Sequence, residues 1–87
     1  MRSIENITRD IAHVSATLSH EARNVRWYGR KVGKLRGLIK HSDKKRAEAL
    51  AGKYRKNAEK LHRAVDAYTS YLTIIQDELK EMHEASK

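Results

Sequence analysis

Two long stripes of apolar residues, each repeating at alternating spacings of three and four, constrain the fold of this chain most strongly. The first comprises Ile4, Ile7, Ile11, Val14, Leu18, Glu21/Ala22, Val25, Tyr28, Val32, Leu35 and Ile39. The second comprises Ala47, Leu50, Tyr54, Asn57/Ala58, Leu61, Ala64/Val65, Tyr68, Tyr71, Ile75, Leu79 and Met82. Each stripe covers about five heptads, and heptads sustained over this length predict coiled-coil helices.

A single segment, His41-Ser42-Asp43, interrupts the two stripes. Ser42 or Asp43 is suited to cap the second helix, because both side chains accept hydrogen bonds from free backbone N–H groups. We therefore predict one all-α domain over residues 1–87, with a helix over about 3–40, a turn at 41–43 and a helix over about 43–85. So short a turn makes the helices antiparallel neighbours, which defines a long, coiled-coil-like helical hairpin.

The register of this hairpin follows from residue numbers, because facing residues in an antiparallel pair have a constant number sum. Ile4 with Met82 and Val25 with Leu61 both sum to 86. Since these pairs lie far apart along the rod, one register fits the whole hairpin.

Three glycines spaced four apart, Gly29, Gly33 and Gly37, interrupt the first helix with residues that disfavour helix. One interpretation is a small-residue face that lets the second helix approach closely near Ala47, Ala51 and Gly52. A second interpretation is a break after Gly29, which would give three helices. A third is a smooth surface that lets the backbone of a partner come close. The unbroken heptad phase favours one continuous helix.

A wide apolar face on the second half of the second helix predicts self-association. One hairpin covers each helix on one side only, so a second copy would cover this face. We expect a homodimer that forms a four-helix bundle, packed most tightly at the end that carries the termini. The face consists of Val65, Tyr68, Tyr71, Leu72, Ile74, Ile75 and Leu79.

The charge of the chain is concentrated at one end of the predicted hairpin. The chain has 19 Lys+Arg and 11 Asp+Glu, a net charge of +8. Residues 23–63, the end that carries the turn, contain fifteen of the bases and three of the acids, which is a net charge of +12. Such a concentration favours an anionic partner. The candidate partner-binding residues are Arg23, Arg26, Trp27, Arg30, Lys31, Lys34, Arg36, Lys40, Lys44, Lys45 and Arg46.

Trp27 lies within this basic region and points away from the predicted seam, about 200° around the helix from Val25. An outward tryptophan could stack on a base, anchor a protein partner together with Leu38, or be buried in the dimer interface.

Several classes of function are disfavoured by composition. The chain has no cysteine, which fits a reducing compartment and excludes thiolate chemistry, so we expect a cytoplasmic protein. No apolar run approaches the roughly 20 residues of a membrane span. The initial Met1 leads us to expect a complete chain. We predict no cofactor and no metal site, and expect no enzymatic activity.

Residues 16–24, Ala-Thr-Leu-Ser-His-Glu-Ala-Arg-Asn, resemble the H-box of the dimerisation domain of two-component histidine kinases. That family is also a helical hairpin that dimerises into a four-helix bundle. The resemblance implies that His20 is a phosphoacceptor, that Glu21 is its acid/base neighbour, and that Asn24 takes part in the phosphatase step. The family's Pro-Leu pair is Val25-Arg26 here, and no ATP-binding domain is present, so such a hairpin would only relay phosphate.

The sequence thus leaves three functions open for a small dimeric, non-enzymatic binding protein. The leading one is that the basic turn end, residues 23–63, binds nucleic acid. The second is an adaptor or inhibitor that binds an acidic protein surface through the same end and the Trp27/Leu38 face. The third is phosphotransfer through His20.

Overall fold

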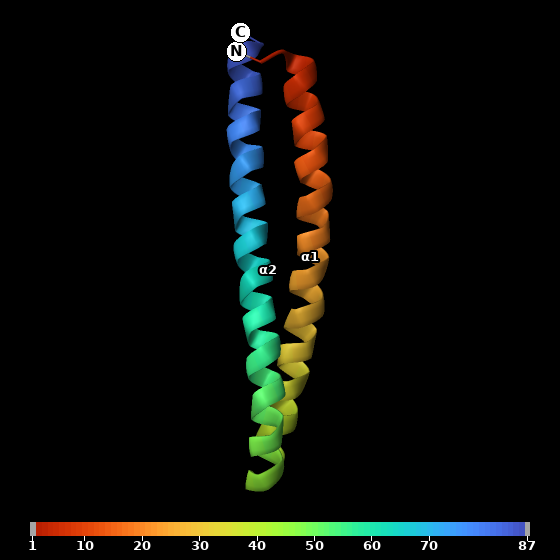
Figure 1. Ribbon diagram of the computed structural model, residues 1–87, viewed down its shortest axis with the longest axis vertical. Coiled ribbons are helices and arrows are strands. Elements are labelled where there is room, and N and C mark those ends of the chain that lie inside the picture. Colours follow the sequence, from red (N-terminus) through yellow and green to blue (C-terminus); the bar gives the residue numbers. More distant parts are fainter. Residues whose placement is uncertain (1, 87) are drawn as a thin grey trace.

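Two long antiparallel helices make up the computed structural model, which describes residues 2–86. Helix α1 spans Ile4–Lys40 and helix α2 spans Lys44–Ala85. They form a rod whose Cα atoms extend over 63 × 14 × 14 Å, with both chain ends at one end of the rod and the turn at the other (Figure 1). The predicted all-α helical hairpin is therefore confirmed. Over the described residues, neither helix has an apolar stretch long enough to cross a bilayer.

Each helix begins directly after a side-chain cap. The Ser3 hydroxyl accepts a hydrogen bond from the Asn6 N–H at 3.2 Å, so α1 begins one residue later than predicted. A carboxylate oxygen of Asp43 accepts from the Arg46 N–H at 2.8 Å. Of the two candidate caps, Asp43 is therefore the one used. Its negative charge offsets the unfavourable placement of cations in the first turn of α2, where the helix dipole prefers anions.

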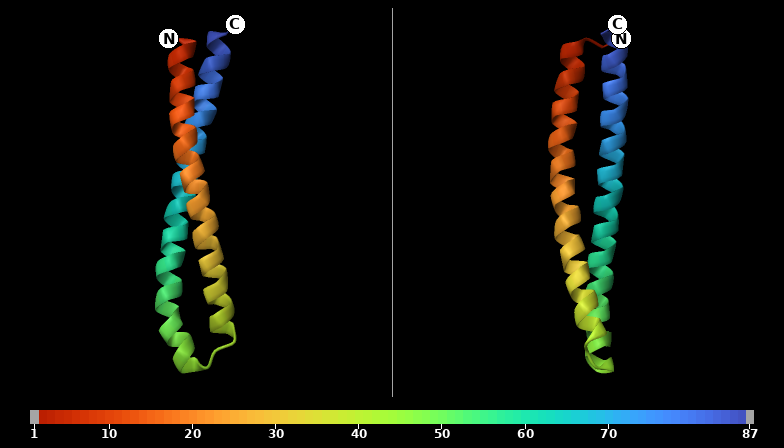
Figure 2. Two further views of the ribbon diagram at one scale, coloured as in Figure 1. Left: turned by 90° about the vertical axis from the view of Figure 1, so that its right-hand side faces the viewer. Right: turned by 180° about the vertical axis from the view of Figure 1, so that it is seen from behind.

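The predicted stripes line the seam between the helices. Every position of both stripes is buried or half-buried except Ile4, Val65 and Leu79. The helices cross and wrap around one another (Figure 2), as a repeat of 3.5 residues per turn requires. Because a two-helix rod has an interior only along this seam, Ile7 and Ala64 alone among residues 2–86 are buried, and only Ile7 is fully so.

Helix α1 runs without interruption through Gly29, Gly33 and Gly37, so the three-helix interpretation is wrong. The interpretation that α2 approaches these glycines closely is also wrong. A Cβ added at any of them would meet no atom within 4 Å beyond its own helix turn and chain neighbours. The reason is geometric: residues spaced four apart drift across the helix surface and cannot follow a seam that repeats every 3.5 residues.

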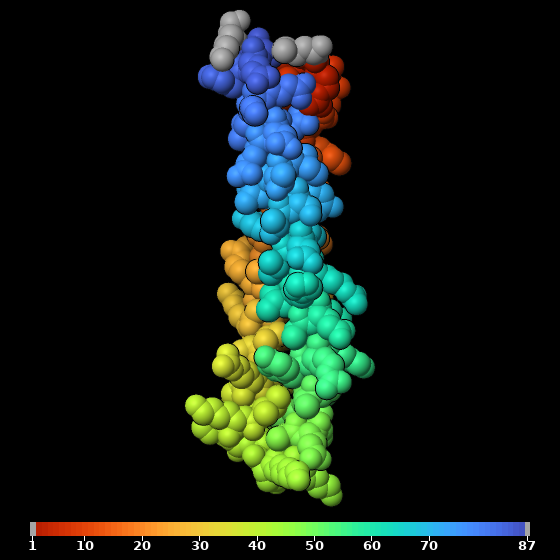
Figure 3. Space-filling model, turned by 90° about the vertical axis from the view of Figure 1, so that its left-hand side faces the viewer, coloured from red at the N-terminus to blue at the C-terminus, as the bar shows by residue number. Residues whose placement is uncertain are grey.

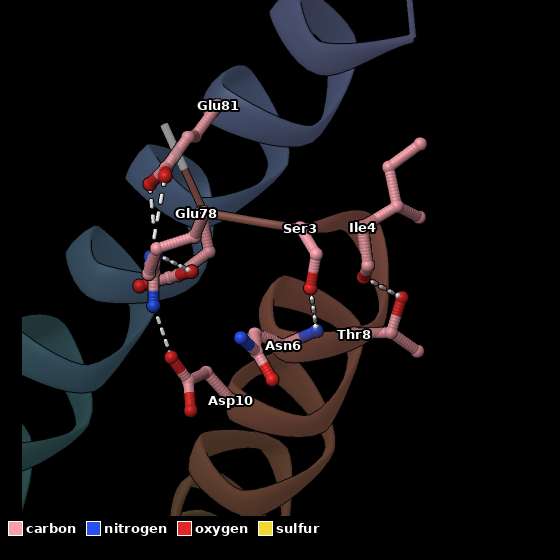
Figure 4. A network of polar contacts seen from close by, with 8 residues as sticks. Ser3, Ile4, Asn6, Thr8, Asp10, Glu78 and Glu81 are labelled. Atoms are coloured by element: carbon pink, nitrogen blue, oxygen red, sulfur yellow. Dashed lines mark hydrogen bonds and ion pairs between the residues drawn. The ribbon is translucent and has the colours of Figure 1, made fainter.

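A polar network that the sequence analysis did not foresee joins the two chain ends (Figure 4). The Arg2 guanidinium donates to Glu81 at 2.7 and 3.2 Å, and also to Glu78 of α2 and Asp10 of α1. The hydrogen bond from Arg2 lowers the pKa of the Glu81 carboxyl, and the two glutamates raise the pKa of Arg2. The only sequence signal was the spacing of Glu78 and Glu81, which puts both on one face of α2.

Candidate functional site

All fifteen lysines and arginines of residues 23–63, here called the basic end, are solvent-exposed. Within residues 2–86 none of them forms an ion pair, since the ion pairs there involve Arg2 and His62. Their long side chains project from the yellow and green part of the rod in Figure 3. The cations are Arg23, Arg26, Arg30, Lys31, Lys34, Arg36, Lys40, Lys44, Lys45, Arg46, Lys53, Arg55, Lys56, Lys60 and Arg63.

The basic end is compact because the chain folds back on itself at the turn. Residues 23–40 of α1 occupy about 27 Å of rod at 1.5 Å per residue, and α2 returns beside them. Fifteen cations therefore share a length only two to three times the Debye length of about 10 Å. Of the three acids nearby, Asp43 is engaged as the cap of α2. The mutual repulsion of these cations is thus left largely uncompensated by the chain itself.

A groove of about 590 Å³ lies along one flank of the basic end, between α1 and α2. Its apolar wall includes Trp27, which is 58% exposed, and Leu38, which is 39% exposed. Four cations also line it, and none of its described lining residues is acidic. This surface is called the Trp27 groove, and its principal residues are Trp27, Arg30, Lys34, Leu38, Lys53 and Asn57.

Aromatic rings and cations alternate along this flank. The Lys31 ammonium lies 5.8 Å from the centre of the Trp27 ring. The Lys60 ammonium of α2 lies 5.9 Å from the centre of the Tyr28 ring of α1. Both distances are within the range of cation–π attraction, so these cations lie against aromatic surfaces instead of pairing with carboxylates.

Asn57 is a polar residue on the seam beside the Trp27 groove. Its side-chain amide donates to the Lys53 carbonyl at 2.8 Å. Its Oδ1 is buried and accepts no hydrogen bond from residues 2–86. A buried acceptor without a donor costs about 1–3 kcal/mol, so a donor supplied by water or a ligand would be stabilising here.

The sequence analysis found the α1 side of this groove but not its α2 side. Trp27, Arg30, Lys31 and Lys34 were all candidate residues, whereas Lys53 and Asn57 were not. The register held the missing signal: Lys34 with Lys53 sums to 87 and Lys31 with Asn57 to 88, close to the 86 of the seam pairs.

The three H-box residues differ in their surroundings. His20 is exposed, as its outward position on the helical wheel predicts. Glu21 and Asn24 are half-buried and line a shallow hollow between the helices, together with Lys60 and Ala67 of α2. The structure therefore brings Glu21 and Asn24 together on the side facing α2 and leaves His20 outside that hollow.

No protein-family model, curated protein or solved structure matches this chain. The likeness of residues 16–24 to the H-box stays a prediction. The features of the hairpin that bear on its function are therefore its charge, its exposed side chains and its grooves.

Proposed function

We propose that this protein is a small, non-enzymatic nucleic-acid-binding protein whose basic end contacts the phosphate backbone. The observation that carries the proposal is the set of fifteen exposed cations without an ion pair among residues 2–86. A polyanion relieves their mutual repulsion and releases its own condensed counterions, which favours binding.

The proposed binding mode is directed at phosphates and reads little sequence. Lysine and arginine side chains on a helix surface bind phosphate oxygens, which sets position but carries no base information. Four cations line the Trp27 groove. If each contacts one phosphate, the slope of log K against log salt on duplex DNA is about −4, at −0.9 per contact.

The test is a salt titration of binding to random-sequence duplex DNA and to structured RNA. The double variant Lys34→Gln/Lys53→Gln should make the slope shallower by about 2, or one unit for each lost phosphate contact. The matched control is Arg9→Gln/Lys80→Gln, which removes the same charge from exposed positions of the other half of the rod. Its slope should equal that of the parent.

The absence of binding at low salt would overturn the nucleic-acid proposal. An acidic protein surface would then be the better candidate, because Trp27 and Leu38 are exposed beside the cations. Such a partner would form a complex of fixed stoichiometry that is lost in Trp27→Ala.

We also propose that the protein is a homodimer. Val65, Leu72 and Leu79 are exposed on α2 at a spacing of seven residues, which is the repeat that a further coiled-coil helix requires. This apolar strip belongs to the terminal half of the rod, where the net charge is −4 over residues 1–22 and 64–87. A second copy that packs antiparallel about Leu72 keeps the two basic ends at opposite ends of the dimer, where they do not repel.

Sedimentation equilibrium tests the dimer. The parent should sediment with twice the mass of the chain, and Leu72→Glu should sediment as a monomer because a carboxylate in the strip is costly to bury. Gln76→Glu, an exposed position outside the strip, is the control and should remain dimeric. A parent that is monomeric at tens of micromolar would refute the proposal.

Phosphotransfer through His20 is the remaining candidate, and the exposure of His20 is the observation in its favour. It predicts an acid-labile phosphate after incubation with a phosphorylated response-regulator domain. The label should be absent in His20→Gln, and its absence from the parent would exclude this function.

A further inference from the structure

We infer that the Trp27 groove binds an unpaired nucleobase, so that the protein prefers single-stranded to fully paired nucleic acid. This inference rests on the proposed function, because the basic end must first hold the phosphate backbone. It adds a specific role for the groove: recognition of the unstacked state of a base.

The ring of Trp27 is exposed beside the groove. A large aromatic side chain that is 58% exposed has ring surface free to stack. The Lys31 ammonium lies 5.8 Å from the centre of the indole, so a base that stacks on the exposed ring surface would also lie beside a cation. In a duplex each base is already stacked on its neighbours, whereas an unpaired base offers a free π-face.

The groove combines an apolar wall with positive charge. Its volume of about 590 Å³ lies within the 300–1,000 Å³ of typical small-ligand clefts. Leu38 and the Trp27 ring form an apolar wall, and Arg30, Lys34 and Lys53 place positive charge around it. A nucleotide has the complementary composition, with a flat apolar base joined to an anionic phosphate.

Asn57, which lines the groove, has a side-chain oxygen, Oδ1, without a hydrogen-bond donor among residues 2–86. Ligand sites combine apolar walls with a few polar groups that orient the ligand. Every nucleobase carries an amino or ring N–H group on its edge, and such a donor would satisfy this oxygen if rotation of the Asn57 side chain brings it to the groove surface.

Three other hollows on the rod lack this combination. One is lined by residues of α2 alone and includes Glu59, whose carboxylate repels phosphate. The second includes only one cation, Arg26. The third is the shallow hollow described above, where the Glu21 carboxylate likewise repels phosphate. The Trp27 groove is therefore the better site for a nucleotide.

The experiment uses Trp27 as its own reporter, because the chain contains a single tryptophan. The parent is titrated at low salt with a 15-nucleotide oligothymidylate and with a 15-base-pair duplex, each carrying a fluorescent label. Anisotropy of the label reports binding, and emission from Trp27 reports stacking in unlabelled parallel titrations. We expect the single strand to quench Trp27 saturably and the duplex to bind without quenching.

Variants separate stacking from charge. Trp27→Ala should weaken single-strand binding by about 5- to 140-fold, the equivalent of 1–3 kcal/mol per stacked base, and should change duplex binding less than twofold. Trp27→Tyr, which keeps an aromatic ring, should retain most of the affinity. Ile4→Ala removes an exposed apolar side chain from the other end of the rod and should have no effect on binding.

Three outcomes would overturn the inference. Single-strand binding without quenching of Trp27, equal quenching by the duplex, or unchanged affinity in Trp27→Ala would each show that the groove holds no base, while the proposed function would stand. Failure of both oligonucleotides to bind at low salt would overturn the proposed function as well. If circular dichroism shows that Trp27→Ala has lost helicity, its affinity no longer reports on stacking. The quenching of the parent and the affinity of Trp27→Tyr then test the inference.

Discussion

Replacing Gly29, Gly33 and Gly37 together by alanine is expected to stabilise the hairpin. All three lie inside the continuous helix α1, and none has a positive φ angle. A methyl group added at each position meets no atom within 4 Å beyond its own helix turn and chain neighbours. Alanine therefore causes no clash and removes the conformational entropy that glycine loses on folding.

The expected size of the effect follows from helix propensity. Alanine is favoured over glycine in a helix interior by about 0.8–1 kcal/mol per residue, so three substitutions give about 2.5–3 kcal/mol. A domain of this length gains roughly 4–8 °C in Tm per kcal/mol. The triple variant should therefore melt roughly 10–24 °C above the parent.

Circular dichroism melts and urea denaturation at several protein concentrations measure this gain. The control is Ala16→Gly, the reverse change at an exposed position of the same helix, which should cost about 1 kcal/mol. A triple variant that melts at or below the parent would refute the reasoning. It would mean that the methyl groups displace a neighbour that packs on the glycines, and a simultaneous change in sedimentation would identify that neighbour as a second copy.

Three further stability predictions use the same denaturation assays. Ile7→Ala should cost about 2–5 kcal/mol because Ile7 is fully buried, whereas Ile4→Ala should cost far less because Ile4 is 47% exposed. Asn57→Leu should stabilise the hairpin by about 1 kcal/mol, because it removes a buried acceptor without a donor. The bond from Arg2 lowers the pKa of Glu81, so its stabilisation is fully present above the ordinary glutamate pKa and is lost as pH falls through the lowered value. Arg2→Gln should therefore reduce stability at neutral pH and flatten its dependence on pH below about 4, and an unchanged acid profile would count against the ion pair.

The sequence was sufficient for the helices and the seam, because heptad spacing directly encodes which side of each helix is covered. It was insufficient at the end of the rod that carries the termini. Ile4 and Leu79 belong to the predicted stripes yet are exposed, and Glu78 is half-buried instead, held by Arg2. The half-buried position of Glu78 depends on Arg2, which lies outside both helices. The heptad pattern of the helices carries no information about such a residue.

The candidate site was predictable in its charge but not in its shape. Counting charges along the chain located the basic end, and the helical wheel placed Trp27 outside the seam. The groove needed the rotation of α2 relative to α1, which brings Lys53 and Asn57 next to residues of the first helix. Asn57 itself was read as one of the core positions, and the orphaned state of its oxygen becomes visible only when its neighbours are placed.

The position of the turn has a consequence for the order of folding. Contacts beside the turn close the shortest loops, so a hairpin of this kind is expected to zip from Asp43 outward. The contacts of Arg2 with Glu78 and Glu81 join residues 76 and 79 apart and close last. The first step of zipping thus brings together the most strongly repelling cations of the chain. Added salt, or a polyanion, should speed folding as well as stabilise its product. If the basic end binds nucleic acid as proposed, the nucleic acid would act as a folding template.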